Sequence, residues 1–89
     1  MSNSNEFLTA AGYAKKLNQS PTNNELLSLY KYYKQSVVGN NDTTKPGILN
    51  IRAKAKWEAW TSVKDLSKHN SEVEYIKLVN EMIKKYGVN

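Results

Sequence analysis

A short aromatic and basic segment, Leu29–Gln35, holds the side chains best suited to binding a ligand. Tyr30, Tyr33 and Lys34 are related as i, i+3 and i+4, so in a helix they share one face. An ammonium group gives a phosphate charge-assisted hydrogen bonds, a phenol adds a directed donor, and an aromatic ring offers a stacking surface. The segment therefore suits a ligand with a phosphate and a ring, and it equally suits amphipathic core tyrosines with hydrated hydroxyl groups.

A second segment, Arg52–Trp60, combines cations, tryptophans and small residues. Arg52 and Lys56 are related as i and i+4, and Trp57 and Trp60 as i and i+3, so we expect both indoles to be mostly buried. The three interspersed alanines allow a neighbouring helix or a ligand to approach closely. A buried tryptophan pair beside a solvated row of lysines is the alternative interpretation.

The residue types give little support for a catalytic site or a metal site. His69 is the sole histidine, and no orienting acid or oxyanion hole accompanies it and the nearby Ser67. The chain has no cysteine, and one histidine with scattered carboxylates does not make a metal site. No glycine-rich phosphate loop is present. The sequence therefore predicts a protein that is not an enzyme and has no metal or cofactor.

Length and charge limit the organisation and the partners. The 89 residues fit a single domain, 1–89, and carry 13 basic and 8 acidic side chains, for a net charge of +5. A basic surface attracts nucleic acids, anionic membranes or phosphorylated small molecules, or it is solvated without a ligand. No basic start with an apolar core opens the chain, and no apolar run approaches the roughly 20 residues that span a bilayer. We therefore expect a soluble, cytoplasmic protein without stable membrane insertion.

Hydrophobic periodicity predicts an all-α protein with four helices. The first begins near Asn5, the second begins near Thr22 or Asn23 and stops at Gly39, and the third runs from about Arg52 to Lys64. The last helix begins at Ser71, where Glu74 completes a capping box, or earlier at Ser67.

Apolar stripes at helical spacing mark the faces that we expect to pack. They are Phe7, Ala10, Ala11, Ala14 and Leu17 in the first helix, Leu26, Leu27, Leu29, Tyr30, Tyr33 and Val37 in the second, and Val73, Ile76, Val79 or Asn80, Ile83 and Tyr86 in the last. The turn-forming stretch 39–47 separates the two helical halves, and a connection of this length does not require a simple up-and-down bundle.

The combined pattern resembles the acyl-CoA-binding protein family, and the likeness covers essentially the whole chain. It is carried by Tyr30-x-x-Tyr33-Lys34-Gln35-Ser36-x-Val38-Gly39, Pro46-Gly47, Lys54-Ala55-Lys56-Trp57-Glu58-Ala59-Trp60 and Tyr75-Ile76. The resemblance implies an up-down-down-up four-helix bundle whose last helix begins near Ser67. It also implies a monomeric carrier and pool former that binds one long-chain fatty acyl-CoA tightly, passes it to acyl-CoA-using enzymes and does not convert it.

The resemblance also implies a set of ligand-binding residues. Tyr30, Lys34 and Lys56 match positions that engage the adenosine 3′-phosphate, and Tyr33 and Tyr75 match aromatic positions against the adenine and nearby parts of the ligand. The first helix and the centre of the second supply three further candidates. They are Lys15, at a basic position near the pyrophosphate, and the variable pair Lys31 and Tyr32.

Some residues depart from the family pattern, and one rival class competes with it. Asn40 and Asn50 stand where the family often has Asp, Ala53 where Gly is frequent, and Asp65 where Gly is usual, which puts the geometry of loops and helix ends in question. A nucleic-acid-binding bundle is the main rival, because it is also small, basic and helical. The acidic residues and the lack of a dense basic stripe argue against nucleic acid as a partner.

Overall fold

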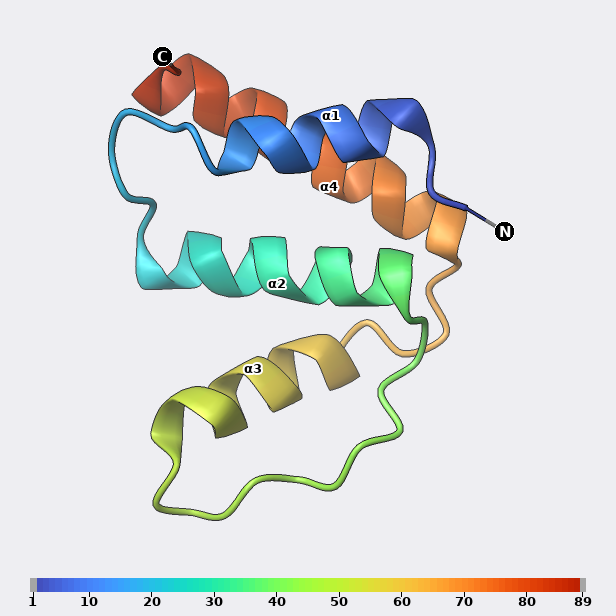
Figure 1. Cartoon of the computed structure of the whole chain (residues 1–89). Coiled ribbons are helices and arrows are strands. Elements are labelled where there is room, and N and C mark those ends of the chain that lie inside the picture. Colours follow the sequence, from blue (N-terminus) through green and yellow to red (C-terminus); the bar gives the residue numbers. More distant parts are fainter. Residues whose placement is uncertain (1, 89) are drawn as a thin grey trace.

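Four α-helices form the protein in a computed structural model that describes residues 2–88 (Figure 1). They are α1 (Asn5–Ala14), α2 (Asn23–Val37), α3 (Ile51–Thr61) and α4 (Lys68–Tyr86). Helices α1 and α4 run in one direction, and α2 and α3 run in the opposite direction (Figure 1). The expected all-α class and the up-down-down-up order are therefore confirmed.

A polar side chain caps the amino end of each helix, as the free N–H groups there require. Thr22 forms the capping box of α2, in which its hydroxyl accepts from the N–H of Glu25 and its own N–H donates to the Glu25 carboxylate. Asn50 caps α3, which is shorter than expected and ends at Thr61. Ser4 rather than Asn5 caps α1, because its extended backbone and hydroxyl position suit the N–H of Phe7.

The structure decides between Ser67 and Ser71, the two possible N-caps of α4. Ser67 is the cap, and its hydroxyl accepts from the N–H of Asn70 at 3.0 Å. The capping box expected at Ser71 is wrong, because residues 68–70 already continue the helix. Ser71 is instead fully buried, and its hydroxyl has no hydrogen-bond partner in the described part of the chain.

The core lies mainly between α1, α4 and α2. Phe7 and Ala10 of α1 form a buried cluster with Tyr75 and Val79 of α4. Helix α4 packs on both α1 and α2, whereas α3 packs on α2 (Figure 1). The smallest dimension of the molecule is 15 Å, so the helices form a thin, open arrangement rather than a closed bundle. Within residues 2–88, no helix is both long and apolar enough to cross a bilayer.

Two of the predicted apolar stripes are less buried than expected. Leu26, Tyr33 and Val37 of α2 each expose more than 40% of their surface, and so does Val73 of α4. The buried residues of α2 are Gln35 and Ser36 instead. The reason is that α4 and α3 cover different sides of α2 and leave its apolar stripe partly open.

The polar side chain of Gln35 links α2 to both following segments. Its amide nitrogen donates to the carbonyl of Leu66 at 2.9 Å and to Asn40 at 2.8 Å, and its oxygen accepts from the indole of Trp60. A buried amide with these partners is satisfied and therefore fixes the orientation of neighbouring segments. Gln35 thus sets how α3 and the turn before α4 sit against α2.

The turn between α3 and α4 explains one departure from the family pattern. Asp65 adopts a positive φ of 71°, a conformation that favours glycine. Its N–H donates to the Asn40 side chain at 2.8 Å, and the Asn40 amide donates back to the Asp65 carboxylate at 3.0 Å. This pair of hydrogen bonds holds the turn although a non-glycine residue occupies it.

The segment before α1 is also anchored. Asn3 donates from its amide to the carbonyl of Ser36 and to the carboxylate of Glu72, which also accepts from the N–H of Ser4. Burial alone would raise the pKa of Glu72, but these hydrogen bonds outweigh it and lower that pKa. A carboxylate on α4 therefore stabilises the amino end of α1.

Candidate ligand-binding site

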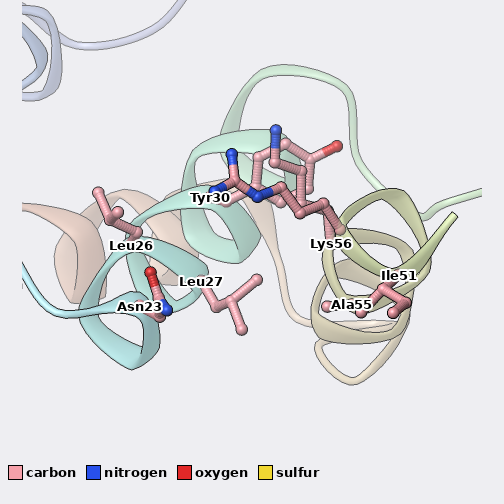
Figure 2. A pocket seen from close by; sticks show the side chains of 8 residues that line it. Asn23, Leu26, Leu27, Tyr30, Ile51, Ala55 and Lys56 are labelled. Atoms are coloured by element: carbon pink, nitrogen blue, oxygen red, sulfur yellow. The ribbon is translucent and has the colours of Figure 1, made fainter.

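A pocket of about 500 Å³ lies between α2 and α3, and we call it the groove pocket. Its lining residues are Asn23, Leu26, Leu27, Tyr30, Ile51, Arg52, Ala55 and Lys56. Figure 2 shows Leu26 and Leu27 on α2 and Ile51 and Ala55 on α3, with Tyr30 and Lys56 close together at one end. The volume falls in the range of sites for small molecules, and four of the eight lining side chains are aliphatic.

A second pocket of about 330 Å³ lies between the same helices and the loop that joins them, and we call it the loop pocket. Its lining residues are Tyr30, Lys34, Thr43, Thr44, Pro46, Ala53, Lys56, Trp57 and Trp60. Tyr30 and Lys56 line both pockets, so the two pockets adjoin. Together they offer an apolar space that opens into a region with two ammonium groups.

The two lysines of the loop pocket are held against aromatic rings. The ammonium nitrogen of Lys34 lies 4.9 Å from the ring centroid of Trp60, and that of Lys56 lies 5.5 Å from the ring centroid of Tyr30. Cation–π contacts at these distances are favourable and leave the remaining N–H donors free. The one ion pair within residues 2–88 joins Lys85 and Glu25, so no carboxylate neutralises either lysine of the pocket. The arrangement suits a bound anion.

Both tryptophans are fixed by their indole N–H groups. Trp60, which is 5% exposed, donates to the carbonyl of Gly39 at 2.8 Å and to Gln35 at 3.2 Å. Trp57 donates to the carbonyl of Thr43 at 3.0 Å, which ties the connecting loop to α3. The expectation of a mostly buried pair is correct for Trp60, whereas Trp57 is only half-buried because it forms a wall of the loop pocket.

An aromatic cluster joins α1, α2 and α4, and none of its three residues lines either pocket. Tyr33 stacks on Phe7 with a centroid distance of 5.7 Å, and Tyr75 lies 5.0 Å from Phe7 and 5.9 Å from Tyr33. Tyr33 is 41% exposed, whereas Tyr75 is 4% exposed and belongs to the core. Burial raises the pKa of Tyr75 to about 12, so its hydroxyl is protonated at neutral pH. Of these two candidates, Tyr33 is therefore the one that presents a ring surface to solvent.

Three other candidates lie away from the pockets. Lys15 is the exposed C-cap residue of α1, at the end of the molecule where α2 begins (Figure 1). The ammonium nitrogen of Lys31 lies 5.1 Å from the ring centroid of Tyr32, and Tyr32 packs partly against the core. The structure therefore brings together Tyr30, Lys34 and Lys56. None of the other candidates lines either pocket; they are Lys15, Lys31, Tyr32, Tyr33 and Tyr75.

The apolar lining of the groove pocket was not predicted from the sequence to be part of a site. Leu26 and Leu27 belong to a stripe that we expected to pack, and Ile51 precedes the expected start of the third helix near Arg52. The small alanines of α3 gave a partial signal, because Ala55 lines the pocket. Nothing in a single sequence shows that α3 stands far enough from α2 to leave space between them.

No metal or acid–base constellation accompanies the pockets. Among the residues that the structure describes, no group of three or more histidine, cysteine or carboxylate side chains could hold a metal ion. His69 is exposed at the start of α4 and lines neither pocket.

The fold and the pockets define a small helical binding domain with a cationic, aromatic site beside an apolar groove. Residues 4–79 match the family model described as "Acyl CoA binding protein". Because the match covers most of the chain, the protein belongs to the acyl-CoA-binding protein family.

Relatives and solved structures agree with this assignment. The chain is 48% identical over 81 residues to "Acyl-CoA-binding protein homolog 1" of Caenorhabditis elegans, covering 91% of the chain and 94% of the relative. It is 50% identical over 77 residues to "Acyl-CoA-binding protein" of Saccharomyces cerevisiae, covering 83% and 88%. The crystal structure of Oryza sativa Acyl-CoA-Binding Protein 2 matches with a TM-score of 0.87 at 38% identity, covering 90% of this chain and 87% of that one. The solution structure of the yeast protein matches with a TM-score of 0.76 at 44% identity, covering 93% and 96%.

Proposed function

We propose that the protein binds one long-chain fatty acyl-CoA thioester with high affinity and acts as an acyl-CoA carrier and pool former. Its relatives at 48% and 50% identity are named acyl-CoA-binding proteins, which supports acyl-CoA as the ligand class. A carrier of this kind shields the thioester and the hydrocarbon chain from water without converting them.

The single observation that carries the proposal is the pairing of the two adjoining pockets. Lys34 and Lys56 are held over aromatic rings without a carboxylate partner, which suits the phosphorylated nucleotide end of the ligand. Leu26 and Leu27, across from Ala55 on α3, give the adjoining groove an apolar lining that suits the hydrocarbon chain. A ligand with one polyanionic end and one apolar end matches both.

The residue roles of the proposal come from the resemblance to the family, and the pockets support part of them. In the proposal, Tyr30, Lys34 and Lys56, which all line the loop pocket, engage the adenosine 3′-phosphate. Tyr33 provides the aromatic surface for the adenine, and Tyr75 supports Tyr33 from the core. Lys15 remains a proposed pyrophosphate contact, although it lines neither pocket.

The expected energies are sufficient for tight binding. Each charge-assisted hydrogen bond contributes about 1.5–3 kcal/mol net. A buried methylene contributes about 0.8 kcal/mol, so a long chain adds on the order of 10 kcal/mol before ordering costs. Nanomolar affinity needs about −12 kcal/mol, which the two ends reach together.

The proposal also covers the oligomeric state, the location and the recipients of the ligand. The protein acts as a monomer without a catalytic step, in the cytoplasm, and passes its ligand to enzymes that use acyl-CoA.

The test is isothermal titration calorimetry with palmitoyl-CoA, CoA and 3′-dephospho-palmitoyl-CoA. We expect one site per chain, tight binding of palmitoyl-CoA, much weaker binding of CoA, and a loss of about tenfold or more without the 3′-phosphate. Equal affinity for CoA and palmitoyl-CoA would remove the groove pocket from the proposal. Equal affinity for the two palmitoyl ligands would remove the roles of Lys34 and Lys56.

A further inference from the structure

The most exposed large apolar side chains of the described chain stand together at the start of α3. Leu49 is 95% exposed, Ile48 79% and Ile51 77%, and the next most exposed large apolar residue is Leu8, with 55%. We call these three residues the apolar tip. Single exposed apolar residues are ordinary, but three at such exposure within four positions form a patch that contributes almost nothing to packing.

The backbone holds the apolar tip in an ordered turn. The N–H of Asn50 donates to the carbonyl of Gly47 at 3.0 Å, and the Asn50 side chain accepts from the N–H of Ala53 at 3.3 Å as the cap of α3. The connection that contains the tip runs along the outer edge of the molecule, on the side of α3 away from α1 and α4 (Figure 1). The apolar side chains are therefore presented outward by a defined structure.

The charged residues nearest to the apolar tip in the sequence are all positive. Residues 43–57 contain Lys45, Arg52, Lys54 and Lys56 and no carboxylate. Lys45 and Arg52 flank the tip in the sequence and are both exposed, and the ammonium nitrogen of Lys45 lies 5.7 Å from the ring centroid of Trp57. Apolar side chains flanked by cations complement a bilayer that carries anionic headgroups, because the side chains insert among the lipids while the cations meet phosphate and carboxylate groups.

We infer that the apolar tip, with Lys45 and Arg52, is a docking surface for anionic phospholipid membranes. A second copy of the chain fits less well, because three side chains on one turn cannot supply the roughly 800 Å² per partner of a stable interface and the surrounding cations would repel each other. Ile51 belongs both to the tip and to the groove pocket, so docking would bring the mouth of the groove to the membrane. The docking itself does not depend on the proposed ligand.

The first experiment measures co-sedimentation of the ligand-free protein with vesicles. We expect binding to mixed phosphatidylcholine–phosphatidylserine vesicles that falls with added salt, and little binding to pure phosphatidylcholine. The double variant Ile48→Asn/Leu49→Asn should lose about tenfold in partitioning for each side chain, whereas the matched control Leu8→Asn should bind as the wild type does. Binding unchanged in the double variant would overturn the proposal.

Two further measurements exclude other occupants of the apolar tip. Palmitoyl-CoA affinity of the double variant in calorimetry without vesicles should equal that of the wild type. A large loss would assign the tip to covering the bound hydrocarbon instead. Sedimentation velocity should give monomers for both proteins, and a dimer that the double variant abolishes would assign the tip to self-association. The co-sedimentation experiment uses vesicles without acyl-CoA. Its failure is therefore distinct from failure of the proposed function.

A fluorescence experiment on labelled variants complements the co-sedimentation experiment. The chain has no cysteine, so Leu49→Cys and Leu8→Cys each allow labelling at a single position with an environment-sensitive nitrobenzoxadiazole dye. The emission of the label at position 49 should shift to shorter wavelength with the mixed vesicles, and that at position 8 should not. A label at position 49 that stays in water on bound vesicles would contradict insertion.

Discussion

The two sides of α2 differ in what their apolar residues do. On the side of α1 and α4, Phe7, Tyr75 and Val79 are at most 4% exposed and close a small core. On the side of α3, Leu26 is 46% exposed and Ile51 77%, and the space between the helices is the groove pocket. Similar residue types thus stabilise the fold on one side and leave a site open on the other. The difference arises because α3 packs on α2, whereas α4 packs on both α1 and α2.

The largest expected effect tests the side of α2 that faces α1 and α4, which we call the closed side. Phe7→Ala removes a fully buried ring that contacts Tyr33 and Tyr75, and we expect it to lower the free energy of unfolding by about 3–5 kcal/mol. Urea denaturation measures this change. Leu8→Ala, at the neighbouring exposed position, should stay within about 0.5 kcal/mol of the wild type. Similar losses for the two variants would contradict the placement of the core.

The next effect tests the side of α2 that faces α3, which we call the open side. Lys34→Ala and Lys56→Ala should each weaken palmitoyl-CoA binding by about 1.5–3 kcal/mol, because each removes a charge-assisted contact. Stability should fall by less than about 1 kcal/mol, since only a cation–π contact is lost in the unliganded protein. Calorimetry and urea denaturation on the same variants separate the two effects, with Lys64→Ala as an exposed control outside both pockets. Variants that unfold would assign these lysines to the structure instead.

The third effect concerns the turn that joins the two sides, where Asp65 has a φ of 71°. Asp65→Gly and Asp65→Ala both remove the carboxylate that accepts from Asn40. The difference between the two variants therefore isolates the backbone cost, and the glycine variant should be more stable by about 1 kcal/mol. Thermal unfolding of both variants gives this difference. Equal stabilities would mean that the turn relaxes to negative φ when the side chain is removed.

Sequence patterns predicted where the helices begin and end better than they predicted which helix faces are buried. Periodicity and caps located α2 correctly at Thr22 and Gly39, because these signals are local in the chain. The choice between Ser67 and Ser71 was not decided by local patterns, since both serines satisfy the rule for an N-cap and the resemblance to the family favoured the one that the structure uses. The exposure of Leu26 could not be predicted, because it depends on how far α3 lies from α2.

The candidate site was predicted only where its residues share one helix or one motif. Tyr30 and Lys34 share a helix face and do meet at the loop pocket, and the resemblance to the family added Lys56 from α3. Tyr75 is not part of the apolar stripe predicted for its helix, yet it is buried because α1 brings Phe7 against it. Long-range packing of this kind has no signature in the spacing of residues along one chain.

The smallest effect sharpens the description of the closed side, where α2 begins beside the end of α4. The Tyr86 hydroxyl donates to the carboxylate of Glu25, which also accepts from the N–H of Thr22. These hydrogen bonds, chiefly that from Tyr86, lower the pKa of Glu25 from 4.5 to about 2. Because the folded-state pKa lies below the unfolded value, the associated stability is present above pH 4.5 and is lost as the pH falls toward 2.

Tyr86→Phe removes the main cause of that shift. The variant should melt at a lower temperature than the wild type at pH 7, and the gap should narrow between pH 4.5 and pH 2 as Glu25 becomes protonated in the wild type. Circular dichroism melting curves across this range measure the gap. Tyr13→Phe, at an exposed tyrosine of α1, should show a gap that does not depend on pH. A pH-independent gap for Tyr86→Phe would mean that the hydroxyl stabilises α4 by packing and not through the charge of Glu25.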